Sequence, residues 1–479
     1  MPTILACPRR RETGLPLLER IRAAVRRPAA LFFLLLLLGF GLRLGYGIVR
    51  YRSDLLRLSG PEFIAKWDFD ALEHVLIAHA LVTGKGYVVD DVPGLEGKHV
   101  RAVGQEALFK APLYEFFLAG VFAVSGFSFA LFFPIQSLLG GILSGFVGLL
   151  ALKTWERPAA AWIAGVAAAV HPVLVNSASQ PYNENLFFLL FVAAVWTFGR
   201  WLDTRLRRWA IACGVVAALW ILARESAAPP FAAMVIFGAV TGWREPRRLG
   251  GLGVIVLVAA ALIAPWSVRN YVRMGDVVPV ASIVGSSLLQ GNNECVARES
   301  VLTPFWGEGP CRATDAKRAA LLARLKPTVA ATVVSQDRVA GQVALDFILN
   351  NPAAYLKLCV RRLWTGLLPY NPRADQKFIQ RTAFTIFWLA IVPVGLLGTA
   401  LHLVLMPRRA VLLALLTAVN LAALVAVLIT PDQRYRAGID LLLGCFAGWG
   451  YDRWLRRSSD DQTESMPWLS AGRPSGVDG

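Results

Sequence analysis

Charged side chains are scarce in this sequence, and the patterns that bind zinc are missing from it. Asp, Glu, Lys and Arg make up 17% of the 479 residues, whereas 56% are hydrophobic and the mean hydropathy is +0.52. Apolar runs of about 20 residues, the length that crosses a bilayer, recur along the chain. These features exclude a soluble multidomain protein and predict a polytopic membrane protein. The motifs CxxC and HExxH do not occur, so no dedicated zinc site is indicated.

Basic residues outnumber acidic ones, which gives a formal net charge of +17 and a pI near 10.1. Such a charge is typical of nucleic-acid binding, but here Lys and Arg lie in short clusters between apolar runs and form no continuous basic face. We therefore expect no nucleic-acid partner. Much of the excess is attributed to the positive-inside rule, which concentrates Lys and Arg in cytoplasmic linkers.

The distribution of positive charge predicts ten membrane spans with both termini in the cytoplasm. The basic N-terminus precedes the run Leu31–Val49, which is longer than the apolar part of a signal peptide and is expected to be a retained span. If the run 109–126 also crossed, the basic linkers would move to the outer side, so it is expected to be a juxtamembrane helix. The other nine spans are predicted near 127–152, 159–179, 184–202, 209–223, 227–243, 249–268, 382–406, 410–430 and 438–454.

These spans divide the chain into five parts, two of which contain large outer loops. The parts are a basic cytoplasmic segment (1–28), a transmembrane module (29–268) with a first outer loop (50–126), a large outer loop (269–381), C-terminal spans (382–457) and a tail expected to be disordered (458–479).

Both outer loops are expected to contain helices. In the first, Asp70–Thr83 has apolar residues spaced for one face and ends at Gly84 and Gly86, which predicts an amphipathic helix lying on the membrane. In the second, a helical region at Asp315–Asn350 precedes a basic and aromatic stretch, Tyr355–Trp364. These segments are interpreted as a cap that rests on the bilayer.

Cys295 and Cys311 both lie in the large outer loop. An oxidising periplasm would permit a disulfide between Cys295 and Cys311, closing a loop of about 15 residues. Cys213 and Cys445 lie inside apolar runs, where packing explains them.

Acidic residues stand at the outer ends of predicted helices and spans. Asp68, Asp70 and Glu73 start the first-loop helix, and Glu184 starts a span. Helix N-termini favour negative charge, and this alone accounts for both groups. The functional alternative is a general base that takes a proton from an acceptor hydroxyl or amine, with Asp70 the first candidate and Asp68 the second. Glu184 and Glu73 are candidates for binding the acceptor or a metal ion.

Basic residues also lie on the outer side. Lys110, Arg269, Arg434 and Arg436 are candidates for stabilising the phosphate that leaves from a lipid-phosphate sugar donor. Arg434 and Arg436 are the strongest candidates, because they oppose the positive-inside trend in a short outer linker. Contacts with lipid headgroups are the alternative explanation.

A series of short motifs appears in order between residues 65 and 440. The motifs are Asp70–Tyr87, Lys110–Tyr114, Gln136–Gly141, Asn183–Phe187, Ala264–Tyr271 with Gly275, Gly291–Asn293 and Arg434–Arg436. Taken together, the series resembles the GT-C membrane glycosyltransferases. Within these it is most similar to bacterial glycosyltransferase family 39 and RgtA/B/C/D-like proteins, which are related to protein O-mannosyltransferases and aminoarabinose transferases.

The resemblance implies an all-α, polytopic, GT-C-like bundle of about ten transmembrane helices, with juxtamembrane helices and a periplasmic helical cap, in the bacterial inner membrane. It implies an inverting transfer of a sugar from a polyprenyl-phosphate donor to a lipid, polysaccharide or protein acceptor at the periplasmic face. The catalytic aspartate of the family falls on Asp70, its second acidic position on Glu184, and its phosphate-contacting positions on Lys110, Arg434 and Arg436.

The main alternative is a polytopic transporter or lipid flippase. Transporters commonly show internal repeats and ionisable residues in mid-span. No convincing repeat is present, and the charged residues gather at span ends instead. Cofactor use stays open, because Asp70 and Glu184 could share a divalent cation or act without one.

Overall fold

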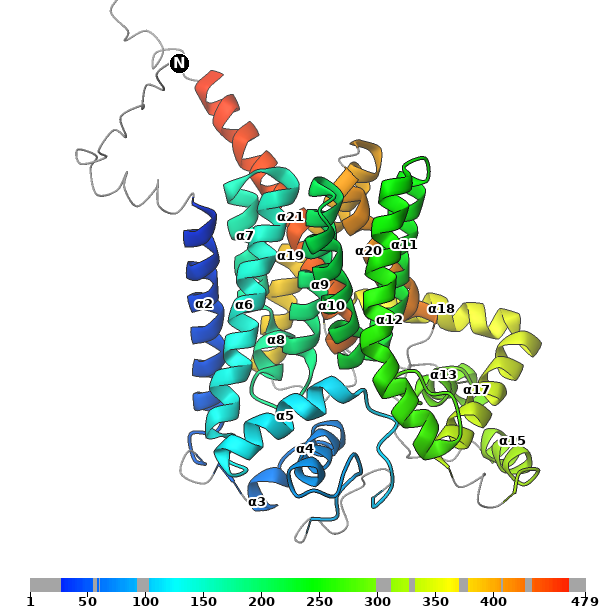
Figure 1. The fold of residues 1–479 in the computed structure, drawn as a ribbon. Helices are drawn as coiled ribbons and strands as arrows, with labels where there is room; N and C mark the ends of the chain where they lie inside the picture. The colour runs from blue at the N-terminus through cyan, green and yellow to red at the C-terminus, as the bar shows by residue number, and fades with distance from the viewer. Residues whose placement is uncertain are drawn as a thin grey trace, which may run out of the picture.

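The described part of the chain is almost entirely helical (Figure 1). The computed structural model describes residues 27–54, 58–59, 61–92, 103–298, 312–326, 332–369, 378–405, 408–426 and 433–464. Within these ranges the extended pairings are two isolated β-bridges, Val88 with Glu106 and Val89 with Val103. The predicted all-α polytopic fold is thus confirmed.

Each predicted span coincides with a helix or with a broken helix. These are α2 (Pro28–Arg50), α6 (Phe129–Trp155), α7 (Pro158–Val170) with α8 (Pro172–Ser177), α9 (Glu184–Thr204), α10 (Arg207–Ala223), α11 (Ala228–Gly242), α12 (Pro246–Met274), α19 (Phe378–Leu405), α20 (Arg408–Ala426) and α21 (Gln433–Glu464). Among the described residues, six helices are long and apolar enough to cross a membrane: α2, α6, α9, α12, α19 and α20. The number ten therefore stays a prediction.

The predicted span 159–179 is not one continuous helix. It breaks at His171, between α7 and α8, because Pro172 follows and cannot donate the hydrogen bond that would continue α7. Arg43 of α2, itself 1% exposed, donates from Nη2 to the carbonyl of Ala168 (3.0 Å) and from Nη1 to that of Ala169 (3.1 Å). A buried cation thus satisfies the last carbonyls of α7, where helix dipoles are negative.

The first outer loop folds at the lower end of the bundle in Figure 1, where α5 (Pro112–Ser125) runs across the ends of the upright helices. Its 14 residues reach about 21 Å, less than the roughly 30 Å of a bilayer core. The short length and the crossing direction agree with the juxtamembrane helix that charge bias predicted for 109–126.

The helix predicted at Asp70–Thr83 exists as α4 (Phe69–Val82), but it is not an amphipathic helix on the membrane surface. Apolar side chains are enclosed on several of its sides: Leu72, Val75 and Ile77 are at most 2% exposed. They share one core cluster with Tyr114 and Leu118 of α5. The surface placement was wrong because α5 and the chain around it cover α4. Gly84 and Gly86, with φ of +77° and +91°, form the turn that follows.

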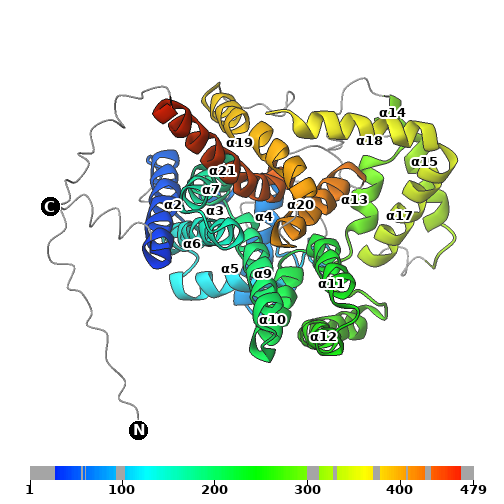
Figure 2. The ribbon, with the colours of Figure 1, turned by 90° about the horizontal axis from the view of Figure 1, so that it is seen from above.

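The second outer loop forms a separate helical group beside the bundle, seen from above in Figure 2. Its helices are α13 (Val284–Gly291), α14 (Glu294–Arg298), α15 (Arg312–Leu322), α17 (Val333–Asn350) and α18 (Pro352–Leu367). The predicted helical region 315–350 lies on α15 and α17, and α18 contains the basic and aromatic stretch. We call these five helices the cap.

Helix bounds differ from the expected segment bounds at two places. The helix α12 continues beyond residue 268 to Met274 and ends at Gly275, whose φ is +67°. The helix α21 continues to Glu464, into the segment expected to be a disordered tail, whereas 465–479 and 1–26 lie outside the described residues.

Candidate active site

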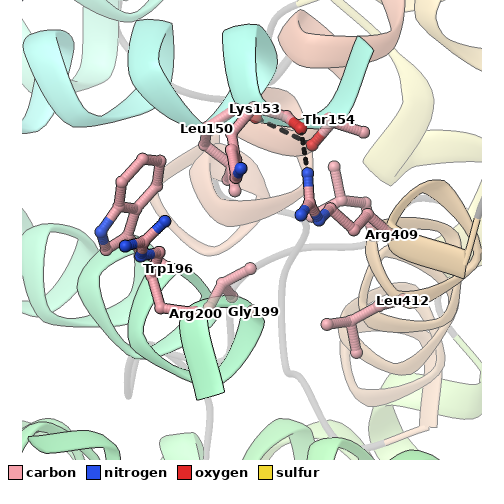
Figure 3. A pocket seen from close by; sticks show the side chains of 10 residues that line it. Leu150, Lys153, Thr154, Trp196, Gly199, Arg200, Arg409 and Leu412 are labelled. Carbon is pink, nitrogen blue, oxygen red and sulfur yellow. Dashed lines mark hydrogen bonds between the residues drawn. The ribbon is translucent and has the colours of Figure 1, made fainter. Parts of the chain in front are cut away.

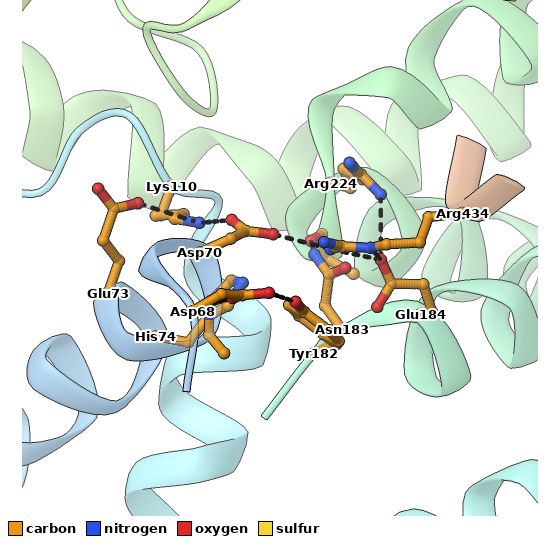
Figure 4. Close-up of polar contacts among 12 residues, drawn as sticks. Asp68, Asp70, Glu73, His74, Lys110, Tyr182, Asn183, Glu184, Arg224 and Arg434 are labelled. Atoms are coloured by element: carbon orange, nitrogen blue, oxygen red, sulfur yellow. Dashed lines mark hydrogen bonds and ion pairs between the residues drawn. The ribbon is translucent and has the colours of Figure 1, made fainter. Parts of the chain in front are cut away.

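Four segments that are distant in the sequence meet at the lower end of the bundle (Figure 4). They are the start of α4, the chain before α5, the start of α9 and the start of α21. At their meeting point the Asp70 carboxylate contacts two cations: Lys110 Nζ on one oxygen and Arg434 Nη2 on the other, the latter at 2.7 Å. The sequence separation of Asp70 and Arg434 is 364 residues, so the tertiary fold alone brings them together.

The Asp70 carboxylate is open to solvent on one side. Its side chain is 30% exposed, against 9% for Lys110 and 20% for Arg434. Burial raises the pKa of the Asp70 carboxyl, but the opposing attraction of Lys110 and Arg434 is stronger and holds this pKa well below its usual range. The carboxylate is therefore charged at neutral pH and reachable from outside.

Lys110 is shared by two carboxylates of α4. Its Nζ contacts Asp70 and lies 3.3 Å from Glu73 Oε2, whose side chain is fully buried. Asp70 and Glu73 are three residues apart on one helix and so lie on the same face. Glu73 is thus a buried partner that holds Lys110 beside Asp70.

Arg434 bridges two acids. Its guanidinium contacts Asp70 and also Glu184, with Nε 2.8 Å from Glu184 Oε1. The ring of Tyr182 lies under the guanidinium, at 3.8 Å from its centroid. Two carboxylates and an aromatic face thus fix the planar fork of Arg434.

Asp68 supports this arrangement from the other side. It is the N-cap of α4, accepting from the Ala71 amide at 3.1 Å, and it also accepts the Tyr182 hydroxyl. The explanation of Asp68 as a helix N-cap therefore holds, and its contact with the Tyr182 hydroxyl joins α4 to the segment before α9. Tyr182 directly precedes the motif Asn183–Phe187, but its hydroxyl contact had no sequence signal.

Arg224 was not predicted as a site residue. It lies 3.9 Å from Glu184 and places its guanidinium over the rings of Tyr435 and Phe187. Its position at the end of α10, on the same outer side, was visible in the sequence. Glu225 follows Arg224 directly, an order that favours a local pair, and only the fold shows the contact with the distant Glu184.

A buried hydrogen-bond layer lies behind the charged residues. His74 Nδ1 pairs with Glu115 Oε1 at 2.7 Å, both almost inaccessible. Gln136 of α6 donates to the Tyr114 hydroxyl (2.7 Å) and to the Tyr182 carbonyl (3.0 Å). The layer joins α4, α5 and α6, and so keeps the outer loop in register with the bundle.

Two predicted cations lie elsewhere. Arg436 is 4% exposed and binds Asp440 (3.1 Å) and the carbonyls of Gly366 (3.0 Å) and Leu368 (2.5 Å). Arg269 pairs with Glu106 and faces the rings of Tyr87 and Trp266. Neither contacts Asp70 or Glu184 within the described residues.

The described residues bear on only part of the predicted Cys295–Cys311 disulfide and of the possible metal site. Cys295 is disulfide-bonded, and Cys311 lies outside the described residues. In the described ranges no three His, Cys, Asp or Glu side chains gather in a group that could hold a metal ion. The Arg434 guanidinium itself lies between Asp70 and Glu184.

Residues 109–268 match the model of a family described as dolichyl-phosphate-mannose-protein mannosyltransferase. This match confirms the predicted resemblance to the GT-C membrane glycosyltransferases. The matched interval contains Lys110, Glu184 and Arg224, whereas Asp70 and Arg434 lie on either side of it. No curated protein matches this chain in sequence.

Two solved structures are similar to this chain. AglB, the archaeal oligosaccharyltransferase from Archaeoglobus fulgidus in complex with an inhibitory peptide and a dolichol-phosphate, gives a TM-score of 0.49 at 13% identity; the comparison covers 94% of this chain but 52% of AglB. The chain thus spans about half the length of AglB. ArnT from Cupriavidus metallidurans, bound to undecaprenyl phosphate, gives a TM-score of 0.38 at 15% identity, over 91% of this chain and 79% of ArnT.

Proposed function

We propose that this chain is an inverting glycosyltransferase that moves a sugar from a polyprenyl-phosphate donor to an acceptor at the periplasmic face of the inner membrane. The observation that carries the proposal is the partly exposed Asp70 carboxylate between Lys110 and Arg434. The family match supports the same class of reaction. The acceptor is a lipid, a glycan or a protein, and the compartment is the periplasm.

In the proposed reaction, an acceptor hydroxyl attacks the anomeric carbon of the donor from the face opposite the phosphate. The bond between this carbon and the phosphate oxygen breaks, and its electron pair leaves with the polyprenyl phosphate. The acceptor proton passes to Asp70, while Lys110 and Arg434 stabilise the negative charge that develops on the phosphate. A single displacement of this kind inverts the configuration of the sugar.

Donor binding activates the base. A carboxylate whose pKa is held low by two cations is a weak proton acceptor. A donor phosphate competes with Asp70 for Lys110 and Arg434, so binding weakens both ion pairs and raises the pKa of Asp70. Glu184 and Glu73 keep the two cations in place during this exchange.

The decisive variant is Asp70→Asn, assayed in purified protein with a defined polyprenyl-phosphate sugar. We expect kcat to fall by about 1,000-fold, because the base is lost. Donor KM is expected to stay equal or to fall, because Lys110 and Arg434 are released for the phosphate. The matched control is Asp54→Asn, which removes a carboxylate of the same loop from a partly exposed pair with Lys66 (2.6 Å). Turnover retained in Asp70→Asn would remove this residue from its role.

One feature favours the alternative function, a transporter. The broken helix α7–α8 places His171 inside the bundle, 3.4 Å from Asp440, and transporters use such breaks to bind ions and substrates. Solute uptake into liposomes containing the protein discriminates the two. The transporter proposal would replace the transferase proposal if the unmodified protein took up solute and transferred no sugar, and if His171→Ala abolished the uptake.

A further inference from the structure

The pocket between α6, α9 and α20 (Figure 3) is too small for a ligand. Its volume is about 20 Å³, room for about one water molecule. Arg409 at its edge already binds Asp203 and the Lys153 carbonyl. A larger feature without a described partner lies on the surface of the cap, on helix α18.

One side of α18 is apolar and exposed. Leu356, Val360 and Trp364 follow one another at four-residue spacing, so they form a stripe along the helix, and they are 64%, 61% and 69% exposed. A helix on the surface of a water-soluble domain presents polar residues to the solvent. The stripe therefore needs an apolar environment outside the described part of the chain.

The opposite side of α18 is fixed to the protein. Leu358, Arg362 and Gly366 recur at the same spacing and are buried, and each lies two residues, about 200° of rotation, from a member of the stripe. Arg362 Nη1 donates to the Val425 carbonyl (3.1 Å) in the last turn of α20. Because these contacts hold α18 by its buried side, the apolar stripe faces away from the bundle.

The end of α20 gives the depth of α18 in the membrane. The 19 residues of α20, from Arg408 to Ala426, extend about 28 Å, close to the roughly 30 Å of a hydrocarbon core. Arg408 therefore stands near one boundary of this core and Ala426 near the other. Arg436, in the first turn of α21, donates to the Gly366 carbonyl (3.0 Å), so α18 lies at the boundary on the side of the candidate active site. In Figure 1, α18 runs across the direction of the upright helices, and thus along this boundary.

Two cations border the stripe. Lys357 and Arg361 directly follow Leu356 and Val360, which places them about 100° further around the helix. Lys357 is exposed, and Arg361 Nη2 is enclosed without a hydrogen-bond partner among the described residues. The acidic residues that the structure describes form no ion pair with either cation. Long basic side chains can cover apolar surface with their stems and keep their charge at the level of lipid headgroups.

We infer that α18 inserts its apolar stripe into the adjacent lipid leaflet and binds anionic phospholipid headgroups through Lys357 and Arg361. Leu356, Val360 and Trp364 lie among the upper parts of the acyl chains, and Trp is enriched at this interface. Helices with an apolar face and basic residues beside it bind anionic membrane surfaces in this way. Lipid is the occupant because α18 is fixed at the boundary of the bilayer, where a protein partner would first have to displace lipid. The inference does not depend on the transferase reaction.

Site-specific photocrosslinking tests the insertion. The photoreactive amino acid benzoylphenylalanine replaces Trp364 in the full chain, which is placed in nanodiscs of equal parts phosphatidylglycerol and phosphatidylcholine and then irradiated. Mass spectrometry identifies the adduct. We expect a lipid adduct at position 364 and none at the control position, Lys326, an exposed residue of the cap that follows α15 and lies farther from the bundle (Figure 1).

Two results would overturn the insertion. One is an equal yield of lipid adduct at both positions. The other is an adduct that joins position 364 to another segment of the chain or to a second copy of it, because protein would then cover the stripe.

The lipid captured at position 364 also tests the headgroup preference. We expect more phosphatidylglycerol than phosphatidylcholine in the adduct, and Lys357→Gln with Arg361→Gln should lower this ratio by about 5-fold or more. The matched control, Arg324→Gln with Lys326→Gln, removes the same charge from two exposed positions of the cap and should leave the ratio unchanged. A ratio that does not change in the stripe variant, or that falls equally in the control, would overturn the role of the two cations.

Discussion

At the residue scale, Arg434 and Arg436 have different partners, and only Arg434 belongs to the candidate active site. Both stand in the first turn of α21, two residues apart, and a helix directs such residues to different faces. Arg434 reaches Asp70 and Glu184, whereas Arg436 reaches Asp440 and the end of α18. From the sequence, both arginines were predicted to contact the donor phosphate. The helix geometry places their side chains in different surroundings.

Arg434→Lys tests whether the guanidinium fork matters beyond its charge. A lysine retains the positive charge but presents a single nitrogen, so it cannot hold Asp70 and Glu184 together as Arg434 does. We expect kcat for sugar transfer to fall about 100-fold, as for loss of one transition-state donor. Steady-state assays of the purified protein measure this.

Arg338→Lys is the control for Arg434→Lys, because Arg338 is an exposed arginine of the cap paired with Asp276. Its kcat should match that of the unmodified protein. Full activity of Arg434→Lys would show that charge alone suffices at this position.

At the scale of elements, arginines from one helix repeatedly bind the last carbonyls of another. Arg43 does so for α7, Arg248 for α11 through Thr241, and Arg362 for α20 through Val425 and Ala426. Helix C-termini carry unsatisfied carbonyls and negative potential, so a buried cation there satisfies both. Part of the basic excess is thus explained by helix packing, in addition to the share that the sequence analysis attributed to membrane orientation.

Small residues let α2 and α6 approach closely. A Cβ on Gly141 would lie 2.6 Å from the Leu36 carbonyl oxygen and 3.0 Å from the Phe40 amide nitrogen, both backbone atoms that cannot rotate away. Close backbone contact through glycines is typical of helices in membranes, because the burial of apolar surface contributes little to helix association there.

Gly141→Ala is expected to lower the stability of the protein by about 1–3 kcal/mol, because the added methyl group pushes α2 from α6. Gly41→Ala on the exposed side of α2 is the control: a Cβ there meets nothing within 4 Å. It should be neutral or stabilising, since Ala favours helix over Gly by about 1 kcal/mol. Thermal unfolding in detergent measures both, and equal midpoints would refute the close contact.

At the scale of the whole molecule, Arg362 is one of the side chains that connect the cap to the bundle. Arg362 of α18, 1% exposed, donates to the Gly291 carbonyl and to Asn292 Oδ1 (3.1 Å) at the end of α13, and to the Val425 carbonyl (3.1 Å) at the end of α20. Since α21, with Arg434, follows α20 in the chain, this contact couples the cap to the helices that form the site.

Arg362→Gln should loosen the cap without unfolding the bundle. Several buried carbonyls lose their donor, which costs about 3 kcal/mol and raises the population of the open cap about 100-fold. Limited proteolysis should then cleave within 284–367 faster, while cleavage between helices of the bundle stays slow. Lys357→Gln, an exposed position on α18, is the control. Unchanged cleavage of the cap would contradict this role.

The sequence by itself determined the class of the molecule and the positions of its helices. Apolar runs of membrane length are local properties, so the helices at the expected spans, the short helix α5 and the end of α17 at Asn350 could be predicted. The Asp68 N-cap was equally local. The break at His171 also had a local signal, in Pro172, but apolar composition on both sides concealed it.

The tertiary structure alone decided which charges meet. Asp70, Lys110, Glu184 and Arg434 lie on segments that converge only after the bundle has packed, and no spacing rule links residues that far apart. The same holds for the enclosure of α4 and for Arg224 beside Glu184. Local patterns fix helices because backbone hydrogen bonds are local, whereas an ion pair depends on where packing places two distant side chains.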